Sequence, residues 1–198
     1  MTLPKIVSDW TALQAMPARE WQCGNCGKHV SERRGFHTSQ GNQAPHPQLF
    51  PCPNCGFPTL FYNGQHPGIR PGRDVDHLPP DVERVYRQAR DCCAIGAFDG
   101  AALLARSLLM HVAVDRGAKP GLTFVEYVDF LEQGHFTPPD SQPWVDHIRT
   151  QGNRAAHKID AASAKDATEL IDFLELILLY LFEFQGRMAA KHGAAGKV

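Results

Sequence analysis

Two pairs of cysteines carry the clearest chemical signal in the sequence. Each pair has the spacing Cys-x2-Cys and lies in a turn rich in Gly, Asn and Pro, namely Cys23-Gly-Asn-Cys26-Gly and Cys52-Pro-Asn-Cys55-Gly. Two such turns can place four thiolates at the corners of a tetrahedron, which is the ligand set of a closed structural zinc site. The sequence therefore predicts that Cys23, Cys26, Cys52 and Cys55 bind one structural zinc ion.

The surroundings of these cysteines indicate a reducing compartment. The first residues lack the apolar segment of a secretory signal peptide, and paired Cys-x2-Cys turns without such a signal are typical of metal ligands. The longest apolar run, residues 176–182, is far shorter than a membrane span. We therefore expect a soluble, cytoplasmic protein that does not associate with membranes.

A second group of polar residues lies in a segment with helical periodicity. Arg149, Asn153 and His157 are four residues apart and so form a column along one edge of the expected helix, with Arg154 within one turn of His157. A guanidinium can bind phosphate oxygens, and an imidazole that titrates near neutral pH can transfer protons.

Two further interpretations of this column stay open. In one, Asn153 and His157 cap the helix, and Arg149 pairs with a carboxylate of the next helix. In the other, the group binds a nucleotide or nucleic acid without cleaving it.

Overall charge does not indicate a nucleic-acid partner. The formal net charge is −1, with seven Lys and Arg against five Asp and Glu in residues 1–77 and thirteen against sixteen in residues 78–198. Binding to a polyanion must therefore come from a local patch. The run Arg33-Arg34-Gly35-Phe36-His37 combines cations with an aromatic ring and is one candidate, the alternative being a solvated loop.

The elements that position these groups divide the chain. We expect a zinc ribbon over 1–62, in which a short leader up to residue 19 includes a helical turn around Trp10–Gln14. Short strands are predicted near 20–22, 28–33 and 59–62. A Gly/Pro-rich linker follows over 63–80, then a helical bundle over 81–190 and a flexible tail over 191–198.

Five helices are predicted in the bundle, so the fold class is mainly α, an α-helical bundle preceded by a small β zinc ribbon. Capping boxes mark two helix starts, Thr123-x-x-Glu126 and Ser163-x-x-Asp166. The expected helices cover 81–97, 101–116, 123–134, 142–157 and 163–190.

The last of these helices is apolar over about twice the width of an ordinary surface stripe. Its acidic residues Glu169, Asp172, Glu175 and Glu183 share one side. Such a helix is buried on two sides, either at the centre of the bundle or at a subunit interface. We expect a homodimer formed through the helical bundle, with a central helix as the alternative.

Three sequence blocks resemble a known family. The run Ile148-Arg149-x-x-Gly152-Asn153-x-Ala-Ala-His157 is similar to the signature of an uncharacterised helical family, found as lone proteins and at the C-terminus of restriction-enzyme subunits. That family belongs to the HEPN superfamily of helical bundles. Segments 102–109 and 167–173 resemble its other recurrent blocks, and the resemblance covers about residues 81–185.

The resemblance implies a HEPN-like fold and a candidate activity. Ribonucleases of the superfamily carry an Arg-x4-6-His motif, often Arg-Asn-x3-His, contributed twice across a dimer. Asn153 and His157 match this motif, whereas Gly152 stands in the place of the arginine, so that Arg149 or Arg154 would have to replace it.

The resemblance implies a protein that associates with nucleic acid. The more specific hypothesis is a metal-independent endoribonuclease of a defence or toxin system. In that reaction the ribose 2′-OH would attack the adjacent phosphate with His157 as general base or acid, and the arginine would neutralise the phosphate. The bond to the 5′-oxygen of the next nucleotide would break and leave a 2′,3′-cyclic phosphate. The alternative is a non-catalytic protein–protein interaction or regulatory module. The implied partners are RNA or another nucleic acid, or a second protein.

Overall fold

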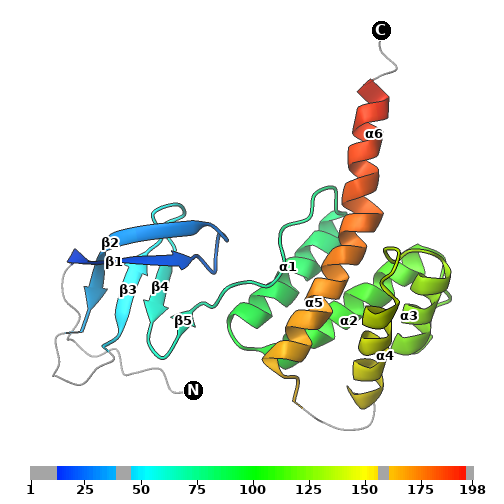
Figure 1. Cartoon of the computed structure of the whole chain (residues 1–198), viewed down its shortest axis with the longest axis horizontal. Coiled ribbons are helices and arrows are strands. Elements are labelled where there is room, and N and C mark those ends of the chain that lie inside the picture. Colours follow the sequence, from blue (N-terminus) through cyan, green and yellow to red (C-terminus); the bar gives the residue numbers. More distant parts are fainter. Residues whose placement is uncertain (1–12, 39–45, 156–160, 195–198) are drawn as a thin grey trace. The chain divides into compact units, whose positions relative to one another are not determined.

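The protein consists of two compact units, residues 1–70 and residues 71–198 (Figure 1). The computed structural model describes residues 13–38, 46–155 and 161–194, with the backbone alone for residues 151–155 and 192–194. The first unit is a sheet and the second is helical. The fold is therefore mixed, with a larger share of β-structure than the mainly α class that the sequence predicted.

Where the structure describes it, the first unit is a five-stranded antiparallel sheet in which every strand pairs with the next one along the chain. The strands are β1 (Gln14–Gln22), β2 (His29–His37), β3 (Gln48–Pro51), β4 (Pro58–Phe61) and β5 (Gln65–His66). The register of β1 against β2 shifts between Ala15 and Arg19, where a bulge interrupts the ladder.

The expected leader is partly wrong, because β1 begins at Gln14, inside the segment up to residue 19 that was predicted to be the leader. Met16 is buried in the ribbon core, so this end of the chain packs as sheet. Residues 10–12 of the predicted helical turn lie outside the described residues.

Three aromatic rings form the centre of the ribbon. The ring centroids of Trp21 and Phe50 are 5.8 Å apart, and the ring of Phe61 packs edge-on to both. Such tilted contacts are favoured between aromatic side chains. Cys23 and Cys52 belong to the same small core, which therefore links the sheet to the cysteine turns.

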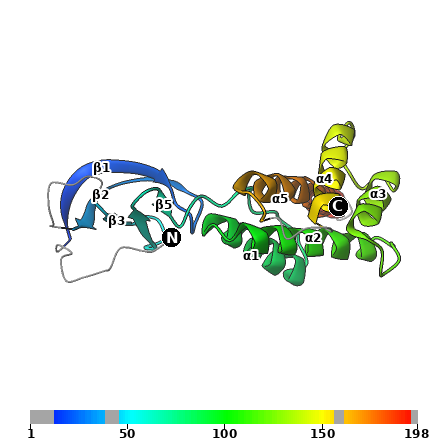
Figure 2. The same ribbon diagram turned by 90° about the horizontal axis from the view of Figure 1, so that it is seen from below.

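In the described residues, the helical unit contains four separate helices and one long composite helix (Figures 1 and 2). Both capping boxes are confirmed, at Thr123 with Glu126 and at Ser163 with Asp166. The elements are α1 (Pro80–Ala94), α2 (Phe98–Asp115), α3 (Phe124–Gln133), α4 (Gln142–Ala155), α5 (Ala164–Leu178), the π-helical turn η1 (Leu179–Glu183) and α6 (Phe184–Ala194).

Helix α5 is the central helix of this unit and contacts α1, α2 and α4. Packing against these helices of the same chain buries most of the wide apolar surface of α5. This agrees with the alternative that the helix lies at the centre of the bundle. Its fully or nearly fully buried residues are Ala167, Leu170, Ile171, Phe173, Leu174, Ile177 and Leu178.

Beyond η1 the helix continues as α6 and extends away from the other helices (Figure 1). Three large apolar side chains spaced four residues apart stay exposed along η1 and α6. These are Tyr180 at 37%, Phe184 at 59% and Met188 at 41%, and we call them the α6 stripe. Residues 191–194 of the predicted tail belong to this helix.

The predicted linker over 63–80 contains structure that belongs to each unit. Strand β5 pairs with β4 in the sheet, whereas Val75 is buried in the core of the helical unit. Arg90 of α1 holds the segment before Val75, since its Nε donates to the carbonyl of Pro71 at 2.8 Å and its Nη1 lies 2.5 Å from Asp74. Among the described residues, no helix is both long and apolar enough to cross a membrane.

Candidate functional site

The four predicted metal ligands lie together. The sulfur atoms of Cys23, Cys26, Cys52 and Cys55 are all within 4.8 Å of one another. The Cys23–Cys55 and Cys26–Cys52 sulfur pairs are each separated by 3.8 Å. A tetrahedron with zinc–sulfur bonds of about 2.3 Å has edges of about 3.8 Å, so the donor set fits a closed zinc site.

The two cysteine turns are built in the same way. One connects β1 to β2 and the other connects β3 to β4. In each, the amide of the first cysteine donates to a carbonyl five residues on, and the glycine after the second cysteine donates back to the first. These glycines, Gly27 and Gly56, have φ values of 69° and 73°, a backbone conformation that other residues rarely adopt.

The turns differ at the residue after the first cysteine. A β-carbon on Gly24 would lie 2.8 Å from the carbonyl oxygen of Pro67, so the first turn needs a glycine there. The second turn has Pro53 at the same place. The segment that follows β5 thus packs closely against the first turn at Gly24.

The four sulfurs fall into an inner and an outer pair. Cys23 and Cys52 are 1% and 2% exposed and lie in the aromatic core, whereas Cys26 is half-buried and Cys55 is exposed. Burial raises the pKa of Cys23 to about 12. For Cys26, burial is outweighed by hydrogen bonds from the Lys28 amide and from Asn54, which lower its pKa to about 6.

Side-chain amides reach the outer sulfurs. Nδ2 of Asn25 lies 3.6 Å from Sγ of Cys55, and Nδ2 of Asn54 lies 3.4 Å from Sγ of Cys26. Neither asparagine was singled out from the sequence, although both precede the second cysteine of their turn.

On α4, Arg149 is surrounded by carboxylates. Its Nε donates to Asp129 at 2.5 Å, its Nη1 donates to Asp146 at 2.6 Å, and its Nη2 pairs with Glu132. All three guanidinium nitrogens are thus used. The partners come from α3 and from α4 itself, not from the following helix as one interpretation expected.

The other members of the predicted column are only partly described. Helix α4 continues through Gly152, Asn153 and Arg154, whose side chains are not described. His157 lies outside the described residues. A different histidine, His147, connects α4 to α5, because its Nε2 lies 2.7 Å from Oε2 of Glu169.

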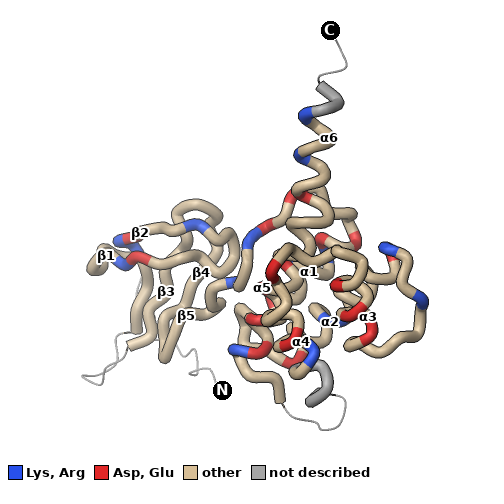
Figure 3. Tube along the Cα trace, turned by 45° about the vertical axis from the view of Figure 1, so that its right-hand side comes forward, with Lys and Arg blue, Asp and Glu red and all other residues tan. Residues whose placement is uncertain are grey.

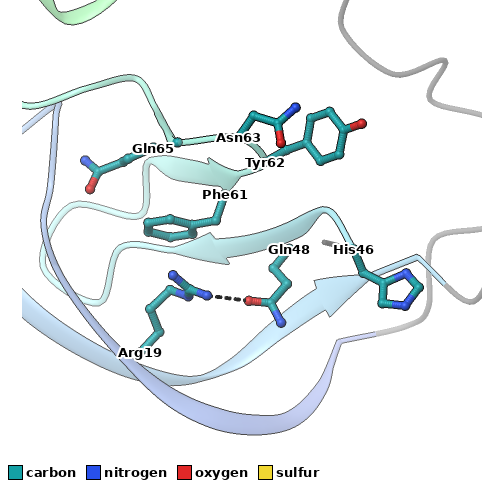
Figure 4. Close-up of a pocket in the computed structure, with 8 residues that line it drawn as sticks. Arg19, His46, Gln48, Phe61, Tyr62, Asn63 and Gln65 are labelled. Carbon is teal, nitrogen blue, oxygen red and sulfur yellow. Dashed lines mark hydrogen bonds between the residues drawn. The ribbon is translucent and has the colours of Figure 1, made fainter. Parts of the chain in front are cut away.

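The ribbon contains a shallow pocket that the sequence did not indicate (Figure 4). The guanidinium of Arg19 lies 4.3 Å from the ring centroid of Phe61 and donates to Oε1 of Gln48 at 2.9 Å. The remaining lining residues are His46, Tyr62, Asn63, Gly64 and Gln65. A cation and an aromatic ring from strands β1 and β4 are therefore brought together, which no local sequence pattern could reveal.

The basic run predicted from the sequence lies on β2. Arg33 and Arg34 are exposed, and their backbone amides donate to the carboxylate of Glu32 at 2.7 and 2.9 Å. Phe36 and His37 are half-buried at the end of the strand. The run is a strand with two outward cations, not a loop.

A family model described as a domain of unknown function, DUF4145, matches residues 87–192, just over half of the chain. No match was found among curated proteins or among solved structures.

Proposed function

Since the chain belongs to the DUF4145 family of domains of unknown function, and its other unit is a sheet with a four-cysteine cluster, we propose a zinc-binding protein that associates with single-stranded nucleic acid through its ribbon. The helical unit is proposed to be HEPN-like. Zinc is proposed as the ion because four clustered cysteine thiolates are its usual structural ligand set.

The observation that carries the nucleic-acid proposal is the division of charge between the units. Residues 1–70 contain six Lys and Arg against three Asp and Glu, whereas residues 71–198 contain fourteen against eighteen. Figure 3 shows basic positions on β1 and β2, and numerous acidic positions in the helical unit. A zinc ion bound by four thiolates would add about −2, which leaves the ribbon near +1 against −4 for the helical unit, so a polyanion is favoured on the ribbon mainly at the exposed pair Arg33 and Arg34.

The Arg19 pocket supplies the kind of contact that single strands use. Bases stack on aromatic rings and on guanidinium planes, largely independently of their sequence. Arg19 already stacks on Phe61, and Tyr62 lies at the pocket edge (Figure 4). Arg33 and Arg34 on β2 would bind the phosphates.

The position of Arg149 favours binding without cleavage. Gly152 replaces the arginine of the ribonuclease motif, and a phosphate would have to displace three carboxylates to reach Arg149. Arg154, Asn153 and His157 are the residues left for the endoribonuclease alternative, in which His157 would act without a metal. A role in a defence or toxin system rests on the family resemblance alone.

The test is a binding and cleavage experiment with the purified full chain. Fluorescence anisotropy with a labelled single-stranded RNA should show binding that weakens about tenfold in the Arg33→Ala/Arg34→Ala variant. Arg84→Ala, which removes an exposed cation of the helical unit, should bind as wild type. Equal binding by all three proteins would contradict the ribbon as the contact.

The same RNA incubated in EDTA tests the alternative. Intact RNA supports binding without cleavage. Cleavage that disappears in His157→Ala would instead establish the endoribonuclease. A third outcome, no RNA binding at all, would favour the non-catalytic protein-interaction module.

A homodimer formed through the helical unit also stays a proposal. The α6 stripe offers three large apolar side chains that stay 37% to 59% exposed. A second copy would present the same stripe, so one two-fold contact would bury both at once.

A further inference from the structure

We propose that Asn25 and Asn54 are positioning residues that protect the two outer thiolates of the metal centre in a crossed arrangement, each acting on a sulfur of the other turn. The inference rests on the proposed zinc centre. It assigns a role to two residues that are not themselves metal ligands.

The crossing follows from the donors and acceptors. Asn25 belongs to the first turn and donates to Cys55 of the second, at 3.6 Å. Asn54 belongs to the second turn and donates to Cys26 of the first, at 3.4 Å. Each asparagine directly precedes the second cysteine of its own turn, and each donates to the second cysteine of the other turn. The two hydrogen bonds are therefore equivalent. These hydrogen bonds connect the turn between β1 and β2 to the turn between β3 and β4 without involving the metal ion.

Protection is divided among the four sulfurs in a complementary way. Cys23 and Cys52 receive no side-chain amide from the described residues, but they are almost fully buried beside Trp21 and Phe50. Cys26 and Cys55 are more accessible, and each has an amide donor. Each sulfur is thus shielded either by burial or by an asparagine.

The first asparagine is itself held in place. Nη1 of Arg70 donates to the backbone carbonyl of Asn25 at 2.5 Å, and the Pro67–Gly68 segment lies against the neighbouring Gly24. These contacts hold the backbone of the first turn at Asn25, the residue whose side chain reaches the other turn.

An amide bound to a thiolate withdraws negative charge from the sulfur. Four thiolates around one divalent zinc ion leave a net charge of about −2, so each such donor stabilises the centre. The same donor lowers the nucleophilicity of its sulfur toward electrophiles. Loss of either asparagine should therefore weaken metal retention and make one particular cysteine more reactive.

The experiment uses the zinc-loaded full chain and the variants Asn25→Ala and Asn54→Ala. The proteins are treated with iodoacetamide, which forms a sulfur–carbon bond and releases iodide, and the modification of each cysteine is followed by peptide mass spectrometry. We expect Cys55 to react about tenfold faster in Asn25→Ala, and Cys26 to react about tenfold faster in Asn54→Ala.

The control is Gln14→Ala, which removes an amide of the same sheet that contacts His37 and no sulfur. It should leave all four rates unchanged. Zinc transfer to a chelator should be faster in the two asparagine variants and unchanged in the control.

The pattern of reactivity distinguishes the proposal from simple loosening of a turn. If Asn25→Ala increased the reactivity of Cys23 and Cys26 in its own turn, or of no cysteine, the crossed role would be wrong. Should an alanine variant fail to fold, Asn25→Ser and Asn54→Ser keep a turn-forming residue that is too short to reach the sulfur, and the same rates decide. Absence of zinc from the wild-type protein would refute the metal centre itself, a result separate from the crossed pattern.

Discussion

Nε of Arg149 on α4 donates to Oδ1 of Asp129 on α3 at 2.5 Å, which ties the edge of the predicted active-site column to a neighbouring helix. With Glu132 and Asp146 on the other two nitrogens, the guanidinium is the centre of a four-residue charge cluster. The residue that the sequence offered as a phosphate ligand thus has a structural role.

Replacing this arginine should destabilise the helical unit. Arg149→Ala leaves three carboxylates close together without their cation, and the arginine side chain is only 21% exposed, so we expect a loss of about 2 kcal/mol in the free energy of unfolding. Urea denaturation followed by helical circular dichroism measures it. Arg84→Ala, whose pair with Asp81 is solvent-exposed at both ends, should change stability by no more than about 0.5 kcal/mol. Equal effects of the two substitutions would contradict the cluster.

Glu183 in η1 should make stability depend on acid pH. It is 4% exposed, and its carboxylate accepts from Nη2 of Arg73 at 3.0 Å and from the amide of Asp76 at 3.1 Å. The bond from Arg73, aided by the Asp76 amide against the effect of burial, lowers the pKa of Glu183 below its ordinary value of 4.5. Its contribution is therefore complete above pH 4.5 and is lost as the pH falls through the lowered value.

We expect Glu183→Gln to cost about 2 kcal/mol at pH 7, because charge-assisted hydrogen bonds are replaced by weaker ones, and to cost progressively less below pH 4.5. Thermal melts across this range measure the difference. The exposed Glu83 of α1 provides the control, since Glu83→Gln should behave as wild type throughout. A pH-independent cost would show that shape and not charge matters at Glu183.

Asp172 on α5 should show the opposite sign. Burial, and then the nearby charge of Glu169, raise the pKa of Asp172 above its ordinary 3.8. Its ionised form is therefore disfavoured by folding, and the associated penalty grows as the pH rises through the raised value. We expect Asp172→Asn to raise the melting temperature by a few degrees at pH 7, with a gain that shrinks as the pH approaches 4. A lower melting temperature at pH 7 would mean that Asp172 makes a favourable ionic contact.

Removing the metal should unfold the ribbon alone. A structural zinc site contributes its binding energy to folding, and the ribbon core around Trp21 and Phe50 is small. After chelation, or in Cys23→Ser, trypsin should cleave at Lys28, Arg33 or Arg34 while a fragment covering the helical unit persists. Metal analysis of the untreated protein should find one zinc per chain. Loss of helical circular dichroism together with the ribbon would show that the two units do not fold independently.

The α6 stripe gives the test of the homodimer. Phe184→Glu places a charge at its most exposed position and should convert the dimer to a monomer in light scattering after gel filtration. Leu103→Glu is the matched control, because Leu103 is a single apolar side chain on α2 that is 70% exposed. A wild-type protein that is monomeric at all concentrations tested would refute the proposal.

Features that depend on nearby residues were predictable from the sequence. The capping boxes at Thr123 and Ser163 are closed by partners three residues away, and the cysteine turns are closed by backbone bonds spanning four or five residues. Local hydrogen bonds of this kind can be predicted from the types and spacing of the residues. The leader failed for the complementary reason, since β1 forms only by pairing with β2 and by burying Met16.

The sequence by itself determined that four cysteines form two matching turns and that helices follow them. Only the tertiary structure decided which sulfurs are buried, that Asn25 and Asn54 reach across to the opposite turn, and that Arg149 is held by Asp129 and Glu132. These contacts join residues 17 to 30 positions apart, and their geometry depends on how separate elements pack. The type of a side chain shows what it can bind, but only packing determines which partner reaches it.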